Sequence, residues 1–232
     1  MPHLLFVCSA NRARSVLAEL HARRLLLRYD APSLTVASAG TEAVAGEPVW
    51  PPAMLAARGA GLDPSAHRSR PLAASLVAEA DLVLTATRAQ RDAVRARFAD
   101  LPGVAGTASK VLTWRELEGV LEHVTPQWGD VPLEQRPALV PAFVAHYRGG
   151  LPTPTPTDLD ALDPSGRGPQ AMAAVARQTQ DAVRLLVEAL CRPAASADRE
   201  VDGRDEEKVA GASPPRRNTH HLRRAPLPGS HW

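Results

Sequence analysis

Cysteine is scarce in this chain: there are two among 232 residues, and no cluster of cysteine and histidine has the spacing of metal ligands. Two cysteines cannot build a disulfide framework, and nothing in the sequence supports a structural zinc site. We therefore expect no bound metal. The scarcity is typical of a protein kept in a reducing compartment, which predicts a cytoplasmic location.

Long apolar runs and an excess of one charge are also missing. The opening segment, MPHLLFVCSA, is too short for a membrane span and has no cationic region before it, so we expect neither a signal peptide nor an anchor. The 27 basic residues are balanced by 25 acidic ones, which argues against a general nucleic-acid binder. Hydrophobic residues make up 44% of the chain, enough to build a core.

Strand-like and helix-like patterns alternate from residue 3 to about residue 114. Short apolar runs predict four strands, at 3–8, 34–39, 81–87 and 109–113. Helical periodicity is found between them, at 14–29, near 52–60 and at 88–98. This order predicts an α/β fold: a single three-layer, Rossmann-like domain with a four-stranded parallel sheet flanked by helices. Ligands of such sheets bind at the carboxyl ends of the strands.

The remainder of the chain is less regular. Residues 115–148 have a helical pattern with a break around 126–130, and a proline-rich connector follows at 151–157. A final helix is expected from about Pro169 to just before Pro193, packed on the sheet. Beyond it, large apolar residues are scarce and charges cluster, so we predict a domain at 1–192 and a disordered tail at 193–232.

One segment, between the first strand and the first helix, carries the chemistry. It reads C-x5-R-S and consists of Cys8, Ser9, Ala10, Asn11, Arg12, Ala13, Arg14 and Ser15. Backbone N–H groups at a strand-to-helix turn can surround an oxyanion, and the helix dipole adds positive charge. That field stabilises a thiolate, the nucleophilic form of a cysteine, at position 8. Arg14 can then donate two hydrogen bonds to phosphate oxygens, and Ser15 can donate to the sulfur.

The segment resembles the loop of the low-molecular-weight protein tyrosine phosphatases, C-x-x-N-x-x-R-S, and the resemblance extends over about residues 3–192. In that family the asparagine adopts a left-handed backbone conformation that turns the loop amides inward. It is held by three side chains, whose counterparts here are Ser15, Ser38 of the SAGT segment and His67 of HRSR. The resemblance therefore implies a supporting network of Asn11, Ser15, Ser38 and His67.

The family also has an Asp-Pro pair before its last helix, which matches Asp163 and Pro164. The resemblance implies two-step hydrolysis of a phosphomonoester through a cysteinyl-phosphate, with Cys8, Arg14 and Asp163 catalytic and no cofactor. Asp158 and Asp160 lie on the same predicted loop and are the alternative acids. The implied partner is a protein that carries phosphotyrosine, such as a bacterial tyrosine kinase.

The chain departs from the family pattern in two ways. Four loop positions differ from the common residues: Ala10, Arg12, Ala13, where a second cysteine is frequent, and Val16. In addition, Val44 and Ser165 replace the two aromatic residues that wall the substrate cleft. Trp128, in the break at 126–130, either packs in the core or covers the cleft as a replacement wall.

Two rival functions stay open. Arsenate has the shape of phosphate, and arsenate reductases share this loop. A reductase coupled to thioredoxin needs two further cysteines, and this chain has only the distant Cys191, but one coupled to a small-molecule thiol needs Cys8 alone. The other rival is a non-catalytic regulator that binds phosphate.

Overall fold

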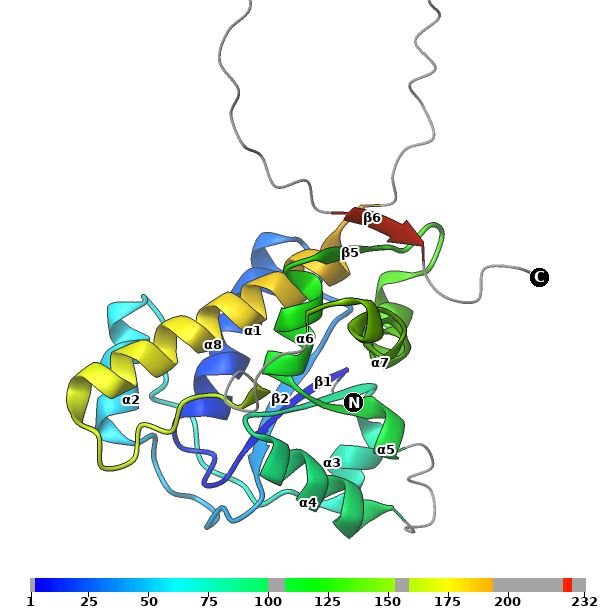
Figure 1. Cartoon of the computed structure of the whole chain (residues 1–232). Helices are drawn as coiled ribbons and strands as arrows, with labels where there is room; N and C mark the ends of the chain where they lie inside the picture. The colour runs from blue at the N-terminus through cyan, green and yellow to red at the C-terminus, as the bar shows by residue number, and fades with distance from the viewer. Residues whose placement is uncertain (1–2, 100–106, 153–158, 194–222, 227–232) are drawn as a thin grey trace, which may run out of the picture.

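The computed structural model describes residues 3–99, 107–152, 159–193 and 223–226. At its centre lies a sheet with the strand order β2-β1-β3-β4, in which each neighbouring pair is parallel. The strands are β1 (Leu4–Cys8), β2 (Val36–Gly40), β3 (Leu82–Thr85) and β4 (Val111–Thr113). The predicted four-stranded parallel sheet is thus confirmed (Figure 1).

Helices connect the strands, as the alternation of patterns predicted. Their bounds are α1 (Arg14–Arg28), α2 (Pro51–Gly59), α3 (Ala74–Glu79), α4 (Arg88–Phe98), α5 (Thr107–Lys110), α6 (Trp114–Leu121), α7 (Arg136–Tyr147) and α8 (Gly168–Cys191). Short 3-10 turns occur at Leu133–Gln135 and Arg148–Gly150. Among the described elements, α3 has no counterpart in the sequence-based prediction, because six residues carry too little periodicity to reveal a helix.

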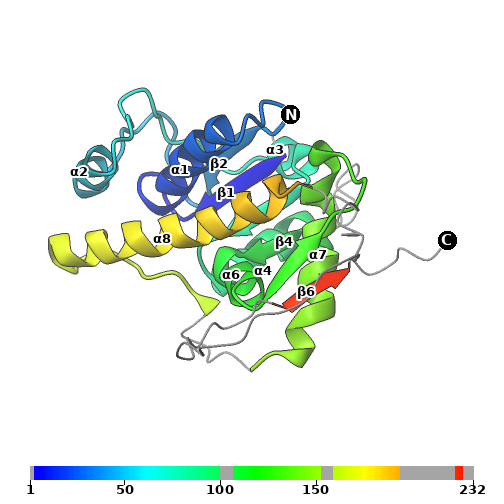
Figure 2. The same ribbon diagram turned by 90° about the horizontal axis from the view of Figure 1, so that it is seen from above.

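The alternation of side chains along β1 builds a core on each face of the sheet. Successive residues of a strand point to opposite faces. Leu4 and Phe6 pack with α1, α6, α7 and α8, whereas Leu5 and Val7 pack with α3 and α4. Figure 2 shows α1 and α8 lying together across one face of the sheet. The three predicted layers follow from this division.

The region between α6 and α7 differs from the prediction. Instead of a helix with a simple break, the chain forms β5 (Val124–Gln127), which pairs in parallel with β6 (Arg223–Pro226). Pro126 has no N–H for a helix, and a strand edge leaves backbone groups that a second segment can satisfy. The segment that does so comes from the range predicted to be disordered. Residues 194–222 and 227–232 of that tail lie outside the described residues, as does Asp158.

The register of the sheet brings the carboxyl ends of its strands to one edge. Cys8 at the end of β1 is opposite Gly40 of β2, and Val7 is opposite Thr85 of β3. The loops that carry the predicted site therefore start side by side. None of the helices in the described ranges has both the length and the apolar character needed to cross a membrane.

Candidate active site

The loop that joins β1 to α1 is shaped by one residue in an unusual conformation and one close contact. Asn11 has φ 53°, in the left-handed region, as the family resemblance implies. Gly40 lies against this loop: a Cβ at that position would come within 2.3 Å of the Ser9 carbonyl oxygen and 2.8 Å of the Asn11 nitrogen. A side chain at position 40 would displace the loop, so glycine is required there.

The side chain of Asn11 is fully buried and holds the loop through several hydrogen bonds. Its Nδ2 donates to Ser15 Oγ at 3.0 Å and to Ser38 Oγ at 2.8 Å. Its Oδ1 accepts from the backbone N–H of Arg70 at 3.0 Å, and its backbone carbonyl accepts from His67 Nε2 at 2.8 Å. The structure thus brings the three implied partners to Asn11 and adds Arg70, whose guanidinium also donates to the Ser38 carbonyl at 2.6 Å.

The direction of these hydrogen bonds fixes the orientation of two hydroxyl groups. Ser38 Oγ donates to Glu19 Oε2 at 2.5 Å, so its oxygen is available to accept from Asn11. Ser15 Oγ also accepts from Asn11, which leaves its own hydrogen free. Cys8 Sγ lies 3.0 Å from Ser15 Oγ, and Cys8 is 3% exposed. Ser15 is therefore set to donate to the sulfur when Cys8 is a thiolate.

Arg14 and Asp163 meet at the mouth of the loop. Arg14, the first residue of α1, is 7% exposed, and its Nη2 lies 3.9 Å from Asp163 Oδ1. Partial burial raises the pKa of Asp163. Two other effects lower that pKa by more: the backbone N–H of Ser165 donates to the carboxylate at 3.0 Å, and the positive charge of Arg14 is nearby. The net pKa lies below the ordinary value of 3.8, so Asp163 is ionised at neutral pH.

The structure separates Asp163 from Asp160. Asp160 Oδ1 accepts from the backbone N–H of Arg88 at 2.6 Å, and its Oδ2 accepts from the Arg88 guanidinium at 3.1 Å. Burial raises the pKa of Asp160, while the bonds from Arg88 lower it, with a net decrease. In addition, Ala161 N donates to the Ala86 carbonyl at 2.8 Å. Asp160 thus fastens the loop to the start of α4, and of the two described acids Asp163 lines the cleft.

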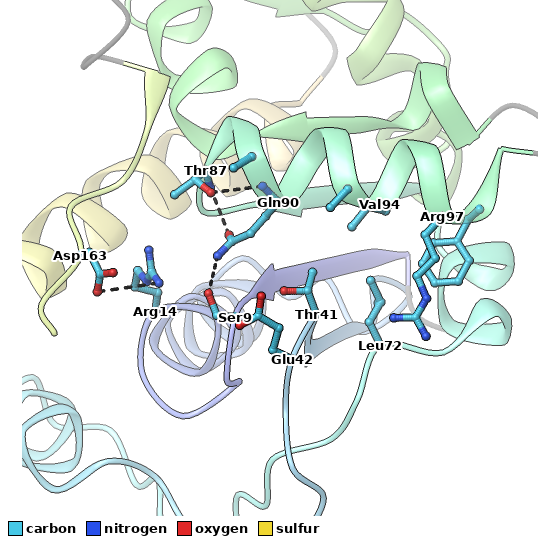
Figure 3. A pocket seen from close by; sticks show the side chains of 13 residues that line it. Ser9, Arg14, Thr41, Glu42, Leu72, Thr87, Gln90, Val94, Arg97 and Asp163 are labelled. Carbon is cyan, nitrogen blue, oxygen red and sulfur yellow. Dashed lines mark hydrogen bonds and ion pairs between the residues drawn. The ribbon is translucent and has the colours of Figure 1, made fainter.

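A cleft of about 540 Å³ opens beside the loop and contains Ser9, Arg14, Gln90 and Asp163 in its lining (Figure 3). Gln90 belongs to a capping box at the start of α4, in which its Oε1 accepts from the backbone N–H of Thr87. Its Nε2 then donates to Ser9 Oγ at 2.9 Å. Sequence reasoning missed Gln90, although the T-x-x-Q pattern of Thr87 to Gln90 was a usable signal.

The remaining residues of the β1–α1 loop include Ala10, Arg12 and Ala13. The Arg12 side chain is bound by a neighbouring segment: its Nη1 donates to Glu47 Oε2 at 3.1 Å, and its Nε donates to the Pro48 carbonyl at 2.9 Å. Ala10 and Ala13 have only methyl side chains and contribute backbone. Within the described parts of the chain, no three histidine, cysteine or acidic side chains gather as metal ligands do.

The aromatic walls expected for the cleft are missing, and Trp128 does not replace them. Val44 is exposed, and neither Val44 nor Ser165 lines the cleft. Trp128 is 3% exposed, its Nε1 donates to the Ala189 carbonyl at 2.6 Å, and it belongs to the main core. The lid hypothesis is therefore wrong: Trp128 packs against α8, and Phe98 is the aromatic residue in the lining of the cleft.

These features define a class of protein: a parallel α/β sheet whose first loop can surround an oxyanion above a buried cysteine. Residues 3–116 match the family model described as low molecular weight phosphotyrosine protein phosphatase. This part of the chain is similar to that family.

Two curated relatives match parts of the chain. It is 38% identical over 94 residues to the probable low molecular weight protein-tyrosine-phosphatase EpsP of Ralstonia nicotianae, a match that spans 40% of this chain and 61% of EpsP. It is 44% identical over 82 residues to the low molecular weight protein-tyrosine-phosphatase Wzb of Salmonella typhi, spanning 35% of this chain and 52% of Wzb. The chain thus covers less than two thirds of the length of either relative.

Solved structures resemble a larger part of the chain. The low molecular weight protein tyrosine phosphatase from T. tengcongensis superposes with a TM-score of 0.58 and 21% identity, over 81% of this chain and 99% of that one. The YwlE arginine phosphatase from Geobacillus stearothermophilus gives a TM-score of 0.53 and 23% identity, over 80% and 90%. At these identities the similarity shows the fold.

Proposed function

We propose that this protein hydrolyses phosphomonoesters, with protein phosphotyrosine as the substrate, through a cysteinyl-phosphate intermediate on Cys8. The observation that carries the proposal is the β1–α1 loop, which runs from Cys8 to Arg14 and brings Arg14 beside Asp163 in the lining of the cleft. Cys8 Sγ lies 3.0 Å from the Ser15 hydroxyl, the loop around Asn11 turns left-handed, and Arg14 sits 3.9 Å from Asp163. A buried thiol, a cation and a carboxyl group are the parts that this reaction requires.

In the first step the Cys8 thiolate attacks phosphorus. The sulfur–phosphorus bond forms as the bond to the leaving oxygen breaks, and Asp163, in its protonated form, transfers its proton to that oxygen. The equatorial phosphate oxygens accept hydrogen bonds from Arg14 and from backbone N–H groups of the loop, which meet the charge of the transition state.

In the second step a water molecule replaces the sulfur. Asp163, now a carboxylate, takes a proton from the water as its oxygen attacks phosphorus. The phosphorus–sulfur bond breaks, Cys8 leaves as a thiolate and inorganic phosphate is released. Ser15 donates a hydrogen bond to the departing sulfur and keeps its proton, and this stabilises the thiolate as a leaving group.

The substrate and setting belong to the same proposal. The names of EpsP and Wzb, both protein-tyrosine-phosphatases, support phosphotyrosine as the reacting group. A bacterial tyrosine kinase that carries phosphotyrosine is the partner we propose, in the cytoplasm, where Cys8 stays reduced. Hydrolysis through Cys8 and Ser15 does not require a second thiol. The other cysteine, Cys191, is the last residue of α8, a helix of 24 residues, whereas Asp163 comes before the first residue of that helix.

Steady-state assays of wild type, Cys8→Ser and Arg14→Ala test the proposal. We expect hydrolysis of p-nitrophenyl phosphate and of a phosphotyrosine peptide by wild type, and a loss of at least about 10³-fold in both variants, because each lacks a group that acts in the transition state. Phosphoarginine serves as a further substrate, since a structural neighbour is an arginine phosphatase and neither expected aromatic lines this cleft.

Parallel assays separate the rival functions. Reduction of arsenate with a small-molecule thiol, in the absence of phosphatase activity, would establish the reductase instead. Binding of phosphate with no turnover of any ester would establish a regulator. Activity within about tenfold of wild type in Cys8→Ser would rule out the cysteinyl-phosphate, because tenfold corresponds to only ~1.4 kcal/mol of barrier.

A further inference from the structure

The cleft does not end at the phosphate-binding loop but continues along one face of α4. Gln90, Ala93, Val94 and Arg97 all line it. They occupy positions i, i+3, i+4 and i+7, which share one side of a helix. Figure 3 shows this row running from Gln90, beside the loop, to Arg97 at the far end, with Thr41, Glu42 and Leu72 opposite. The lining therefore extends well beyond a single phosphate.

Arg97 is a second cation at the end of this cleft. Its side chain is exposed, and its Cζ lies 5.1 Å from the ring centroid of the buried Phe98. No acidic side chain of the described residues forms an ion pair with it. By contrast, Arg91 of the same helix pairs with Asp92 and Glu116. Among the side chains that the structure describes, none neutralises the charge of Arg97.

Arg97 lies away from the phosphate-binding loop, whereas Gln90, whose Nε2 donates to Ser9 Oγ, marks the part of α4 beside that loop. Arg97 comes seven positions after Gln90, which is about 10 Å along the axis of α4. An extended peptide rises about 3.3 Å per residue, so this distance corresponds to about three residues. Between the two ends, Leu72, Ala93 and Val94 offer an apolar floor to the intervening side chains.

The charged side chains that line the cleft favour a ligand whose carboxylate lies at the Arg97 end and not beside the phosphate. Arg14 and Arg97 are the cations, whereas Asp163 and Glu42 are the acids. The backbone N–H of Glu42 donates to the Ser9 carbonyl at 3.0 Å, which keeps residue 42 beside the loop. Its carboxylate would repel a second acid placed next to the phosphate. The pattern of charge therefore matches a phosphate at one end and a carboxylate near Arg97.

We propose that the groove along α4 binds the peptide segment next to the phosphorylated residue, and that Arg97 pairs with an aspartate or glutamate about three residues away. The inference rests on the proposed phosphatase function and adds a substrate class to it: acidic phosphotyrosine peptides. An exposed ion pair contributes little, so we expect a three- to fivefold preference, roughly, that weakens as salt rises.

The test uses the full chain and phosphotyrosine peptides in which one glutamate is moved through positions −4 to +4, each paired with a glutamine peptide. We expect kcat/KM to be raised about three- to fivefold by glutamate near position +3 or −3, and the ratio to fall to about one in Arg97→Gln. Arg28→Gln is the matched control, because Arg28 ends α1, is exposed and does not line this cleft.

The outcomes separate the inference from the function on which it rests. If wild type hydrolyses neither p-nitrophenyl phosphate nor any peptide, the proposed function fails. If it hydrolyses them without regard to the position of glutamate, or if Arg28→Gln loses the preference as Arg97→Gln does, the assignment of Arg97 is overturned. A lower melting temperature of Arg97→Gln with unchanged peptide selectivity also overturns it, since Arg97 would then only stabilise the end of α4.

Discussion

Ser15 Oγ lies 3.0 Å from Cys8 Sγ, and it accepts a hydrogen bond from Asn11 at the same distance. The hydroxyl hydrogen of Ser15 is consequently directed to the sulfur rather than shared among other acceptors. A donor in this position stabilises a thiolate, both before attack and when it departs from phosphorus. The asparagine that shapes the loop thus also determines what the serine does.

Replacing Ser15 with alanine tests this relationship. We expect the second step to slow by about 10- to 100-fold, because a hydrogen bond to a charged group contributes roughly 1.5–3 kcal/mol. The cysteinyl-phosphate should then accumulate and give a burst of p-nitrophenol in rapid-mixing kinetics. Ser15→Thr, which keeps a hydroxyl, is the control. A variant that loses thermal stability but shows no burst would mean that Ser15 only supports the loop.

Asp163 and Asp160 should respond differently to substitution by asparagine. Asp163→Asn removes the proton donor, and we expect a loss of about 10²- to 10⁴-fold in kcat with phosphotyrosine, and less with p-nitrophenyl phosphate, whose leaving group needs no proton. Asp160→Asn keeps Asp163 but weakens the attachment to Arg88, so it should lower stability more than it lowers the rate. The reverse pattern would identify Asp160 as the acid.

The lowered pKa of Asp163 gives a pH dependence with a definite sign. Its protonated form is the one that donates, and with a pKa below the ordinary 3.8 that form becomes more abundant as pH falls. We therefore expect kcat for phosphotyrosine to rise from pH 8 toward pH 5, measured with a constant-ionic-strength buffer series. Asp163→Asn should lack this rise. A wild-type rate that increases with pH over the same range would contradict Asp163 as general acid.

Oxidation of Cys8 should be poorly reversible. Cys191 is half-buried at the end of α8, and burial raises the pKa of its thiol to about 11, so it is a weak attacking group. Without a resolving thiol, sulfenic acid at Cys8 proceeds to sulfinic acid. We expect peroxide-inactivated enzyme to recover little activity with dithiothreitol, and Ala13→Cys to recover more. A Cys8–Cys191 disulfide found by peptide mass mapping would refute this prediction.

Stability at acid pH should depend on His21, a buried residue of α1. Burial and then the charge of Arg24 lower the pKa of His21 from 6.5 to about 4. The unfolded chain therefore binds a proton that the folded one does not, and stability present above pH 6.5 is lost as pH falls toward 4. The loss should reach about 3 kcal/mol near the folded pKa and below. In urea titrations, His21→Gln should show a smaller loss than wild type.

The β1–α1 loop and the sheet were readable from the sequence because they depend on local pattern, whereas the network around Asn11 was implied by the family resemblance. The C-x5-R-S spacing and the apolar runs each lie within short stretches of chain, whereas Ser38 and His67 lie 27 and 56 residues from Asn11. The left-handed Asn11 also follows from local preference, since asparagine tolerates that conformation. These features determine where the phosphate would bind.

Other features required contacts between segments far apart in the chain. The Asp-Pro match pointed to Asp163 and left Asp158 and Asp160 as alternatives. The pairing of Asp160 with Arg88, 72 residues away, occupies that carboxylate, and Asp163 is the one that lines the cleft. The sequence allowed Trp128 to lie either in the core or over the cleft. The hydrogen bond from its Nε1 to the Ala189 carbonyl, 61 residues away, accompanies its position in the core. The α4 face with Arg97 became part of the cleft because β3 packs beside β1. A hydrogen bond or a groove forms only where two segments of the chain come close together. The sequence specifies the residues of each segment, but the distance between the segments is decided by the tertiary structure.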